Sequence, residues 1–505
     1  MSGKESEMKM EEKKEEQIPL RLATVFSGIG AIEQALLRMH IPHEIMFACD
    51  NGDLTPYPCS ASTLEECIAE FRKLDAEIKK MSPVSDGQKN AYEIVKQQRD
   101  RVFNLIEGAE PTSTRPNREL KDRVAMLHEC VGFYKFRVEW EKLPDYISRK
   151  AKVDDLYSSL LKRNAVRKSY QANYQSVTNE KFHWNVSFLE GAQYRDQVDL
   201  FVGGSPCQSF SMVGKQMGLS DTRGTLFYEY ARLVSEIRPK CFIYENVRAL
   251  LSNDNGRTWE TMKKVFTELG YDWQMQTLNA RDYGIPQNRE RVFVVGFRKD
   301  LGISDVFSFP KKKELTTTMQ DYLLDVVAGK YYLPEKGVKF VLDAKNLSKS
   351  YTQVDGTVQL CQKKNQQFNW HGDFVFVDEE TAKKLGAPDL EKYYLSPSVQ
   401  EYVLASGTKN FVSRPKTDLT VARPLLTTMH KMHRSGVDNY VTRNGRLRKL
   451  APRECLRLMG FSDTFKIEVS DTSMYQQAGN AIVVDVLIAI LKQIRKVLPS
   501  IFNGE

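Results

Sequence analysis

The amino-acid sequence predicts a doubly wound α/β fold, and three observations carry this prediction. A strand, a glycine turn, a helix and a second strand follow one another between residues 21 and 50 (RLATVFSG, AIEQALLRMHI and HEIMFACD). Apolar strands alternate with amphipathic helices again between residues 198 and 297. Apolar residues stand next to one another within these strands, which is typical of strands buried on both faces of a parallel sheet.

The second stretch of alternation gives the order of the remaining elements. The pattern predicts strands at 198–204, 240–247, 274–280 and 291–297, and helices at 225–237 and 259–270. Near the end of the chain, NAIVVDVLIAILKQIRKVL forms a strongly apolar helix that must pack against a large surface.

Three segments depart from this alternation. The N-terminal segment is a charged, low-complexity tail that we expect to be disordered, and the segment after residue 52 carries periodic Leu, Ile and Val typical of three or more amphipathic helices. The segment after residue 308 holds aromatic, lysine and asparagine clusters, which indicate a separate, irregular, partly β domain. The predicted divisions are a tail at 1–18, the α/β domain at 19–52, 185–308 and 429–505, a helical insert at 53–184, and the separate domain at 309–428.

The composition indicates a soluble, intracellular protein of two to four domains. Of the 505 residues, 41% are hydrophobic and 27% charged, and we find neither an apolar run of transmembrane length nor a hydrophobic signal core. The eight cysteines include no C-x-x-C pair, so the sequence predicts neither a zinc site nor a disulfide framework. The net charge of +8 is compatible with a polyanionic partner without requiring one.

The first candidate site is FSGIG at residues 26–30, between a strand and a helix. Glycines there let the backbone approach a ligand closely, beside amides at the N-terminus of the helix. Asp50 ends the next strand, where a carboxylate can bind ribose hydroxyls. The string is not a full G-x-G-x-x-G, since Ala31 and Glu33 depart from it, so a plain tight turn with a solvated aspartate is the alternative.

The second candidate is GGSPCQSFS at residues 203–211. Pro206 stiffens the loop and the two glycines admit close approach, while Cys207 follows a strand at the edge where open α/β sheets place ligands. Cysteine is a strong nucleophile at neutral pH. The alternative is a small buried residue, which is the interpretation we give to Cys241 inside the next strand.

Two further motifs carry charged residues at strand ends. Glu245, in ENV, ends a strand of the same sheet, where burial would raise its pKa and make it a proton donor. Arg289 and Arg291, in QNRER, alternate with Glu290 and so share one face, as a pair that binds a carboxylate or a phosphate does. Taken singly, the two motifs are better explained as an N-capping acid and a surface salt-bridge pair.

The order of the motifs resembles the DNA (cytosine-5) methyltransferase family, in particular its bacterial restriction–modification type. FSGIG, GGSPCQSFS, ENV, QNRERVFVVGF, ARPLLTT and QAGNAIVVDVL follow one another at fitting spacings, and RKLAPRECLRLMGFSD is also similar to the family pattern. The likeness covers roughly residues 20–52, 185–300 and 420–495. Each motif is weak alone, but six in order are a strong signal.

The resemblance implies a methyltransferase domain that binds S-adenosylmethionine, a smaller target-recognition domain at 309–428, and duplex DNA between them. It implies a catalytic set of Cys207, Glu245, Arg289 and Arg291. The residues matched to the cofactor pocket are Phe26, Ser27, Gly28, Ile29, Gly30, Asp50, Asn185, Pro206, Leu226, Asn480 and Ile482. Asn185 stands where the family has an adenine-contacting aspartate, and the 53–184 insert has no counterpart in compact members.

The resemblance also implies a mechanism and a set of partners. Cys207 would attack C6 of a flipped cytosine while Glu245 donates a proton to N3, and S-adenosylhomocysteine would be the cofactor product. Lys215 and Arg223, on the glycine-containing loop after the cysteine, are candidate DNA phosphate contacts. A cytoplasmic monomer, encoded by a bacterium or a phage, is expected, with a cognate restriction endonuclease as a further partner.

Three other functions are compatible with parts of the pattern. The same catalytic core acts on tRNA in some proteins, although the long segment before ARPLLTT favours DNA. A catalytically silent DNA-binding protein is the second alternative, and the retention of all four catalytic residues disfavours it. A nicotinamide-dependent dehydrogenase would leave the cysteine loop unexplained.

Overall fold

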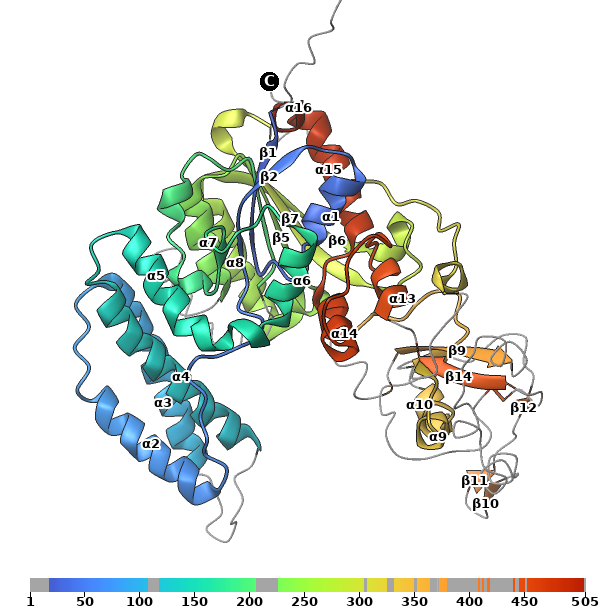
Figure 1. Cartoon of the computed structure of the whole chain (residues 1–505), viewed down its shortest axis with the longest axis horizontal. Helices are drawn as coiled ribbons and strands as arrows, with labels where there is room; N and C mark the ends of the chain where they lie inside the picture. The colour runs from blue at the N-terminus through green and yellow to red at the C-terminus, as the bar shows by residue number, and fades with distance from the viewer. Residues whose placement is uncertain are drawn as a thin grey trace, which may run out of the picture.

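The computed structural model describes residues 18–503 with several internal gaps (Figure 1). The segments outside the description are 1–17, 108–117, 206–225, 304–306, 325–330, 349–351, 364–369, 371, 379–406, 409–410, 413–415, 418–438, 441–444, 450–451 and 504–505, and of 401–450 only the backbone of the strands is described. Residues 1–17 of the predicted tail therefore lie outside the described residues, as do Pro206, Cys207, Lys215 and Arg223.

A seven-stranded sheet forms the centre of the large domain, in the order β3-β2-β1-β4-β5-β7-β6. Its strands are β1 (Leu20–Val25), β2 (His43–Cys49), β3 (Phe182–His183), β4 (Leu200–Gly203), β5 (Cys241–Val247), β6 (Tyr271–Asn279) and β7 (Glu290–Arg298). The first five are parallel, but β7 is antiparallel to both neighbours. The connection between β6 and β7 is too short for a crossover helix, so β7 returns beside β6 as an antiparallel strand.

Helices cover both faces of this sheet, which confirms the predicted doubly wound α/β fold (Figure 1). On one face α1 (Ala31–Arg38), α6 (Ala165–Asn173) and α15 (Val484–Val497) pack against inward-facing strand residues such as Leu22, Val202 and Ile243. On the other face α7 (Leu226–Ile237) and α8 (Arg257–Glu268) pack against Phe201, Phe242 and their neighbours. Adjacent residues of a strand point to opposite faces of the sheet, and each face packs against a hydrophobic core. The strands are therefore apolar throughout.

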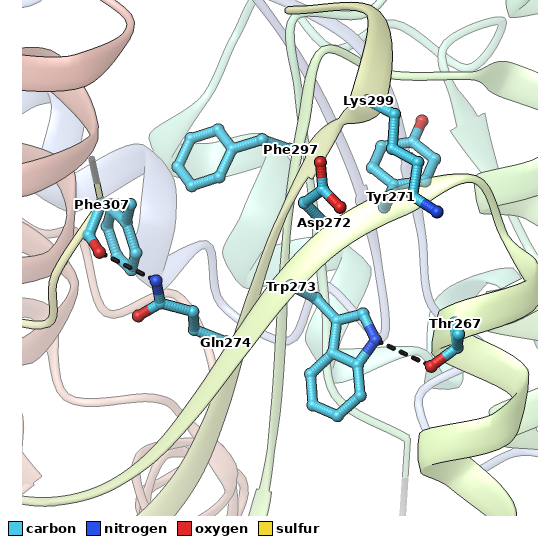
Figure 2. A pocket seen from close by; sticks show the side chains of 8 residues that line it. All are labelled: Thr267, Tyr271, Asp272, Trp273, Gln274, Phe297, Lys299 and Phe307. Carbon is cyan, nitrogen blue, oxygen red and sulfur yellow. Dashed lines mark hydrogen bonds between the residues drawn. The ribbon is translucent and has the colours of Figure 1, made fainter. Parts of the chain in front are cut away.

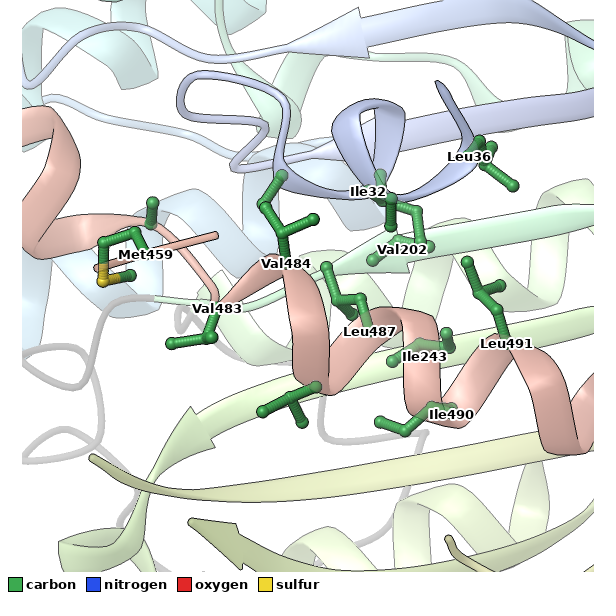
Figure 3. Packing of buried hydrophobic residues seen from close by; sticks show 14 of the residues in the cluster. Ile32, Leu36, Val202, Ile243, Met459, Val483, Val484, Leu487, Ile490 and Leu491 are labelled. Atoms are coloured by element: carbon green, nitrogen blue, oxygen red, sulfur yellow. The ribbon is translucent and has the colours of Figure 1, made fainter. Parts of the chain in front are cut away.

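The C-terminal apolar helix packs where the sequence requires a large surface. Leu487, Ile490 and Leu491 of α15 lie over Val202 and Ile243 of the sheet and beside α1 (Figure 3). By length and composition the stretch Asp471–Val497 could also cross a membrane. The prediction that the chain has no apolar run of transmembrane length is therefore wrong. Of its most apolar 18 residues, 67% are buried within the protein, and α14 (Asp471–Asn480) ends before α15 begins, so core packing accounts for the apolar character.

The segment after residue 53 begins with a three-helix bundle, as the periodicity predicts. The helices are α2 (Leu64–Ile78), α3 (Asp86–Glu107) and α4 (Arg118–Trp140), and they enclose a hydrophobic core of their own. A capping box between Thr63 and Glu66 begins α2. The bundle lies to one side of the large domain (Figure 1).

The same segment continues with helices that belong to the large domain. These are α5 (Tyr146–Tyr157) and α6, which are joined by a 3-10 turn (Ser158–Arg163). Tyr170 and Tyr174 are buried in the same core as α1 and α15. The insert is therefore partly a separate bundle and partly a layer of the sheet domain.

A smaller, partly β unit follows the sheet domain. Its described elements are α9 (Glu335–Val341), α10 (Ala344–Leu347), β8 (Thr352–Val354), β9 (Gly372–Asp378), β10 (Gly407–Thr408), β11 (Phe411–Val412), β12 (Lys416–Thr417), β13 (Asn439–Tyr440) and β14 (Gly445–Lys449). Strand β9 lies between β14 and β8, so β14 joins the sheet of this unit although it follows residue 428. The chain then returns through α13 (Pro452–Arg457), and α16 (Ser500–Asn503) is the last described helix. The domain boundaries themselves stay a prediction.

Glu33, which we noted only as a departure from a glycine motif, is fully buried in the first turn of α1. Its Oε1 accepts a hydrogen bond from the Tyr170 hydroxyl, while Oε2 has no hydrogen-bond partner. Burial raises the pKa of Glu33 from 4.5 to about 7, against the opposing effect of the Tyr170 hydroxyl. The folded protein therefore keeps a proton on Glu33 at pH values where the unfolded chain has lost it.

We predict that Glu33→Gln makes stability less dependent on pH. The raised pKa favours the folded state fully below pH 4.5, and that contribution is lost as the pH rises through about 7. Between pH 5 and pH 8 the free energy of unfolding of the wild type should fall by about 2 kcal/mol more than that of the variant. Urea denaturation at both pH values measures this difference. Parallel pH profiles for the two proteins would contradict it.

Candidate active site

The predicted site residues that the structure describes gather at one edge of the sheet. The loop 26–30 follows β1, Asp50 follows β2, Asn185 follows β3 and Glu245 lies near the end of β5. These strands are parallel, so their carboxyl ends meet at the same edge, where α/β folds bind ligands.

Asp50 links the loop after β1 to the loop after β2 through two hydrogen bonds. Its Oδ2 accepts a hydrogen bond from the Gly28 amide at 2.9 Å, and its Oδ1 accepts one from the Gly52 amide at 2.8 Å. Phe26 and Gly28 both have positive φ, and a Cβ on Gly28 would meet only the Phe26 carbonyl, so space is open beside Gly28. The side chain of Ile29, in contrast, is buried in the core, which leaves only its backbone for a ligand.

Asn185 is held on both sides by protein groups. Its Oδ1 accepts a hydrogen bond from the Ser187 amide at 3.0 Å, and its Nδ2 donates to the Tyr157 hydroxyl at 3.0 Å. Each amide atom keeps one further hydrogen-bonding position, so the side chain can still bind a ligand.

The remaining predicted cofactor residues lie at helix ends. Leu226 begins α7 and is partly exposed, while Asn480 ends α14 and is exposed. Ile482, in the break between α14 and α15, packs partly against the main core.

Glu245 and Arg291 form an ion pair across two strands of the sheet. Arg291 Nε lies 3.2 Å from Glu245 Oε1, and both side chains are mostly buried, at 16% and 13% exposed respectively. In the antiparallel register Arg291 faces Val247, so its side chain reaches Glu245 diagonally on the same face. Burial raises the pKa of Glu245, and the charges of Arg291 and then Arg289 oppose that increase. The carboxyl group is thus biased toward its protonated form.

The cysteine loop begins directly beside Glu245. A Cβ on Gly204 would collide with the Glu245 carbonyl and with its Oε2, so only glycine fits there. Asn246 Nδ2 donates to the Ser205 carbonyl at 2.9 Å, and Ser205 Oγ lies 2.7 Å from the Tyr244 hydroxyl. The first two residues of the loop are therefore fixed next to the carboxylate, and Cys207 is two residues further along the chain.

Arg289 binds backbone carbonyl groups, whereas the sequence predicts that it binds a carboxylate or a phosphate together with Arg291. Its side chain is 3% exposed and donates to the carbonyls of Gln362 (2.8 Å), Gly479 (3.0 Å) and Ala481 (3.0 Å). Burial and then the charge of Arg291 lower the pKa of Arg289 to about 10. Arg289 joins β7, the smaller unit and the α14–α15 break, whereas Arg291 is the arginine that pairs with Glu245.

Several residues of the site were not predicted from the sequence motifs. Asn246 binds the start of the cysteine loop. Asn279 Oδ1 accepts a hydrogen bond from the backbone amide of Arg289 at 3.1 Å. Cys361 Sγ lies 3.7 Å from Arg289 Nη1 and 4.0 Å from Arg291 Nη2. The two arginines outweigh burial and lower the pKa of the Cys361 thiol. Only Asn246 could have been noticed, since it stands inside ENV.

A hollow of about 390 Å³ lies elsewhere, against the edge strand β6 (Figure 2). It is lined by Thr267, Tyr271, Asp272, Trp273, Gln274, Phe297, Lys299 and Phe307. Gln274 Nε2 donates to the Phe307 carbonyl and Trp273 Nε1 to Thr267 Oγ1, so these polar groups are paired within the protein. The start of β6 is at the opposite end of the sheet from Glu245, so the hollow is separate from the site.

Comparison with known proteins identifies the family. Residues 148–496 match the family model for C-5 cytosine-specific DNA methylases. The type II methyltransferase M1.ScrFI of Lactococcus lactis subsp. cremoris is 32% identical over 348 residues, which cover 69% of this chain and 73% of that protein. The type II methyltransferase M.HhaI of Haemophilus parahaemolyticus is 35% identical over 299 residues, which cover 57% and 73% respectively.

The chain belongs to the C-5 cytosine-specific DNA methylase family. It is a DNA (cytosine-5-)-methyltransferase, which confirms the activity that the order of motifs predicts. The family match begins after the α2–α4 bundle, within the first turn of α5, and includes α6.

We predict that Arg289→Ala destabilises the fold more than loss of an exposed arginine does. The substitution removes a buried donor from three carbonyl groups, so the free energy of unfolding should fall by about 3 kcal/mol. Arg248→Ala is the matched control, because that side chain is 66% exposed and its pair with Glu290 should contribute less than about 1 kcal/mol. Urea denaturation of both variants measures the difference. Equal losses of unfolding free energy would contradict the role of Arg289 in holding these carbonyl groups together.

Proposed function

We propose that the enzyme transfers a methyl group from S-adenosylmethionine to C5 of a flipped cytosine at specific sites in duplex DNA. The observation that carries the proposal is the buried Glu245–Arg291 pair beside the start of the cysteine loop, at the ligand-binding edge of a sheet of this family. A proton donor and a nucleophile loop meet there.

The residues after β1, β2 and β3 fit S-adenosylmethionine. Open space beside Gly28 suits close backbone approach, the Asp50 carboxylate suits ribose hydroxyls, and the Asn185 amide suits the adenine edge. Phe26, Ser27, Ile29, Gly30, Pro206, Leu226, Asn480 and Ile482 complete the proposed pocket. The cofactor, when bound, supplies an electrophilic methyl group.

Cys207 and Glu245 prepare the base for this reaction. The Cys207 thiolate attacks C6 while Glu245, whose pKa burial raises, donates a proton to ring N3, and C5 becomes nucleophilic. After C5 has taken the methyl group, a water molecule accepts the C5 proton, the C6–S bond breaks to release the Cys207 thiolate, and N3 returns its proton to Glu245. Arg291 orients the Glu245 carboxyl group, and Arg289 holds the strand that carries Arg291.

Base flipping and partners complete the proposal. C5 is inaccessible in stacked duplex DNA, so the target leaves the helix at a cost of a few kcal/mol. Lys215 and Arg223 contact the DNA backbone, and the unit at 309–428 reads the sequence. The relatives named type II support a cognate endonuclease, although one relative, from Bacillus phage SPR, is named an orphan methyltransferase. The enzyme acts as a monomer in a bacterial cytoplasm.

Bisulfite sequencing of a random duplex library, after incubation with the full chain and S-adenosylmethionine, tests the proposal. Cytosines within one short motif should become protected, and Cys207→Ala should abolish protection while DNA binding persists. Turnover by that variant would exclude Cys207 as the nucleophile. Methylation of tRNA transcripts in a parallel reaction, without protection of the duplex library, would instead favour an RNA substrate.

We predict that Asp50→Ala weakens cofactor binding. The variant loses the ribose acceptor and also frees the Gly28 and Gly52 amides, so the dissociation constant for S-adenosylmethionine should rise at least tenfold, or about 1.4 kcal/mol. Asp50→Asn separates the effects, because its amide oxygen keeps one acceptor. Isothermal titration calorimetry measures both, and an unchanged constant in Asp50→Ala would remove this residue from the pocket.

A further inference from the structure

The part of the predicted insert that follows the bundle touches all three loops of the proposed cofactor pocket. Tyr157, at the end of α5, accepts the hydrogen bond from Asn185. Asn164, which caps α6, lies where a Cβ on Gly52 would be. Tyr174, directly after α6, lies against Gly30. One continuous segment thus contacts the loops after β1, β2 and β3.

The contact between Tyr174 and Gly30 is the closest of the three. The Tyr174 hydroxyl donates to the Gly30 carbonyl at 2.7 Å and lies 3.2 Å from the Ile29 carbonyl. A Cβ on Gly30 would overlap the tyrosine ring. Burial raises the pKa of Tyr174 well above its usual value, so the hydroxyl keeps its proton and stays a donor. Gly30 is therefore a glycine because Tyr174 occupies the space of its side chain.

This contact reinforces the direction of a backbone amide at the start of α1, because the Gly30 carbonyl that accepts from Tyr174 also accepts the first helical hydrogen bond, from the Gln34 amide at 3.1 Å. Gly30 is the N-cap of α1, in the left-handed conformation and without a side-chain cap. The carbonyl and the N–H of one planar trans peptide unit point in opposite directions. Because the Gly30 carbonyl points toward Tyr174, the amide of Ala31 points away from it. Amides at a helix N-terminus bind anionic groups.

We propose that Tyr174 is a positioning residue for S-adenosylmethionine, which holds the Phe26–Gly30 loop in its binding conformation from behind. The inference rests on the proposed cofactor pocket and adds a residue that lies outside the motifs. Tyr157 does the same for Asn185, the position where this chain has an amide in place of the family's acid. Neither tyrosine contacts the methyl group or the base in this proposal.

Tyr174→Phe is the test, with Tyr271→Phe as its matched control. Both tyrosines are buried, at 4% and 3% exposed, and each donates to a backbone carbonyl at 2.7 Å, but Tyr271 bonds to Pro239 at the opposite end of the sheet. Calorimetric titration of the full chain with S-adenosylmethionine should give a dissociation constant about threefold to tenfold higher in Tyr174→Phe only. The KM for the cofactor should rise likewise, with kcat and the KM for DNA unchanged.

Thermal unfolding of both variants shows whether the tyrosines matter equally for stability. Tyr157→Phe is the second reporter and should also raise the dissociation constant, so a poorly folded Tyr174→Phe leaves the inference testable. Equal affinities in Tyr174→Phe, Tyr157→Phe and the wild type would overturn the inference while the proposed function stands. Equal losses of affinity in Tyr174→Phe and Tyr271→Phe would also overturn it. A wild type that does not bind S-adenosylmethionine would overturn the proposed function itself.

Discussion

The buried guanidinium of Arg289 is the interaction on which the arrangement of the site depends. It bonds to one carbonyl group within the smaller unit, between β8 and β9, and to two at the end of α14, some 70 and 190 residues further along the chain. A buried cation requires such acceptors, since it cannot be left without partners in the protein interior. The antiparallel strand β7, which supplies Arg291, is thereby fixed against the helix that covers the sheet.

Arg289 and Arg291, two residues apart in the chain, therefore have different roles. Arg289 faces backbone carbonyls and connects three parts of the chain, whereas Arg291 faces the Glu245 carboxyl group. Burial and the positive charges act on Glu245 in opposite directions, and burial has the larger effect on its pKa. A carboxyl group whose pKa is raised by burial, and which lies beside a fixed cation, suits proton donation to a ring nitrogen.

The glycines of the first loop likewise differ in their surroundings. Gly28 faces open space, and its amide donates a hydrogen bond to Asp50. Gly30 faces the ring of Tyr174. Tyr174 belongs to a segment that the sequence alone assigned to an inserted helical region, and the family match includes that segment. The bundle α2–α4 has its own core, so the inserted region is composed of two parts with separate packing.

The sequence by itself determined the α/β alternation, the three-helix bundle, the buried C-terminal helix and the family, because hydrophobic periodicity and motif order are local properties of the chain. It also brought Gly28, Asp50, Asn185 and Glu245 to one edge, since parallel strands share their carboxyl ends. Only the tertiary structure decided that β7 runs antiparallel, that Arg291 and not Arg289 pairs with Glu245, and that Tyr174 fills the space beside Gly30. Those outcomes depend on contacts between residues far apart in the chain, which no local pattern records.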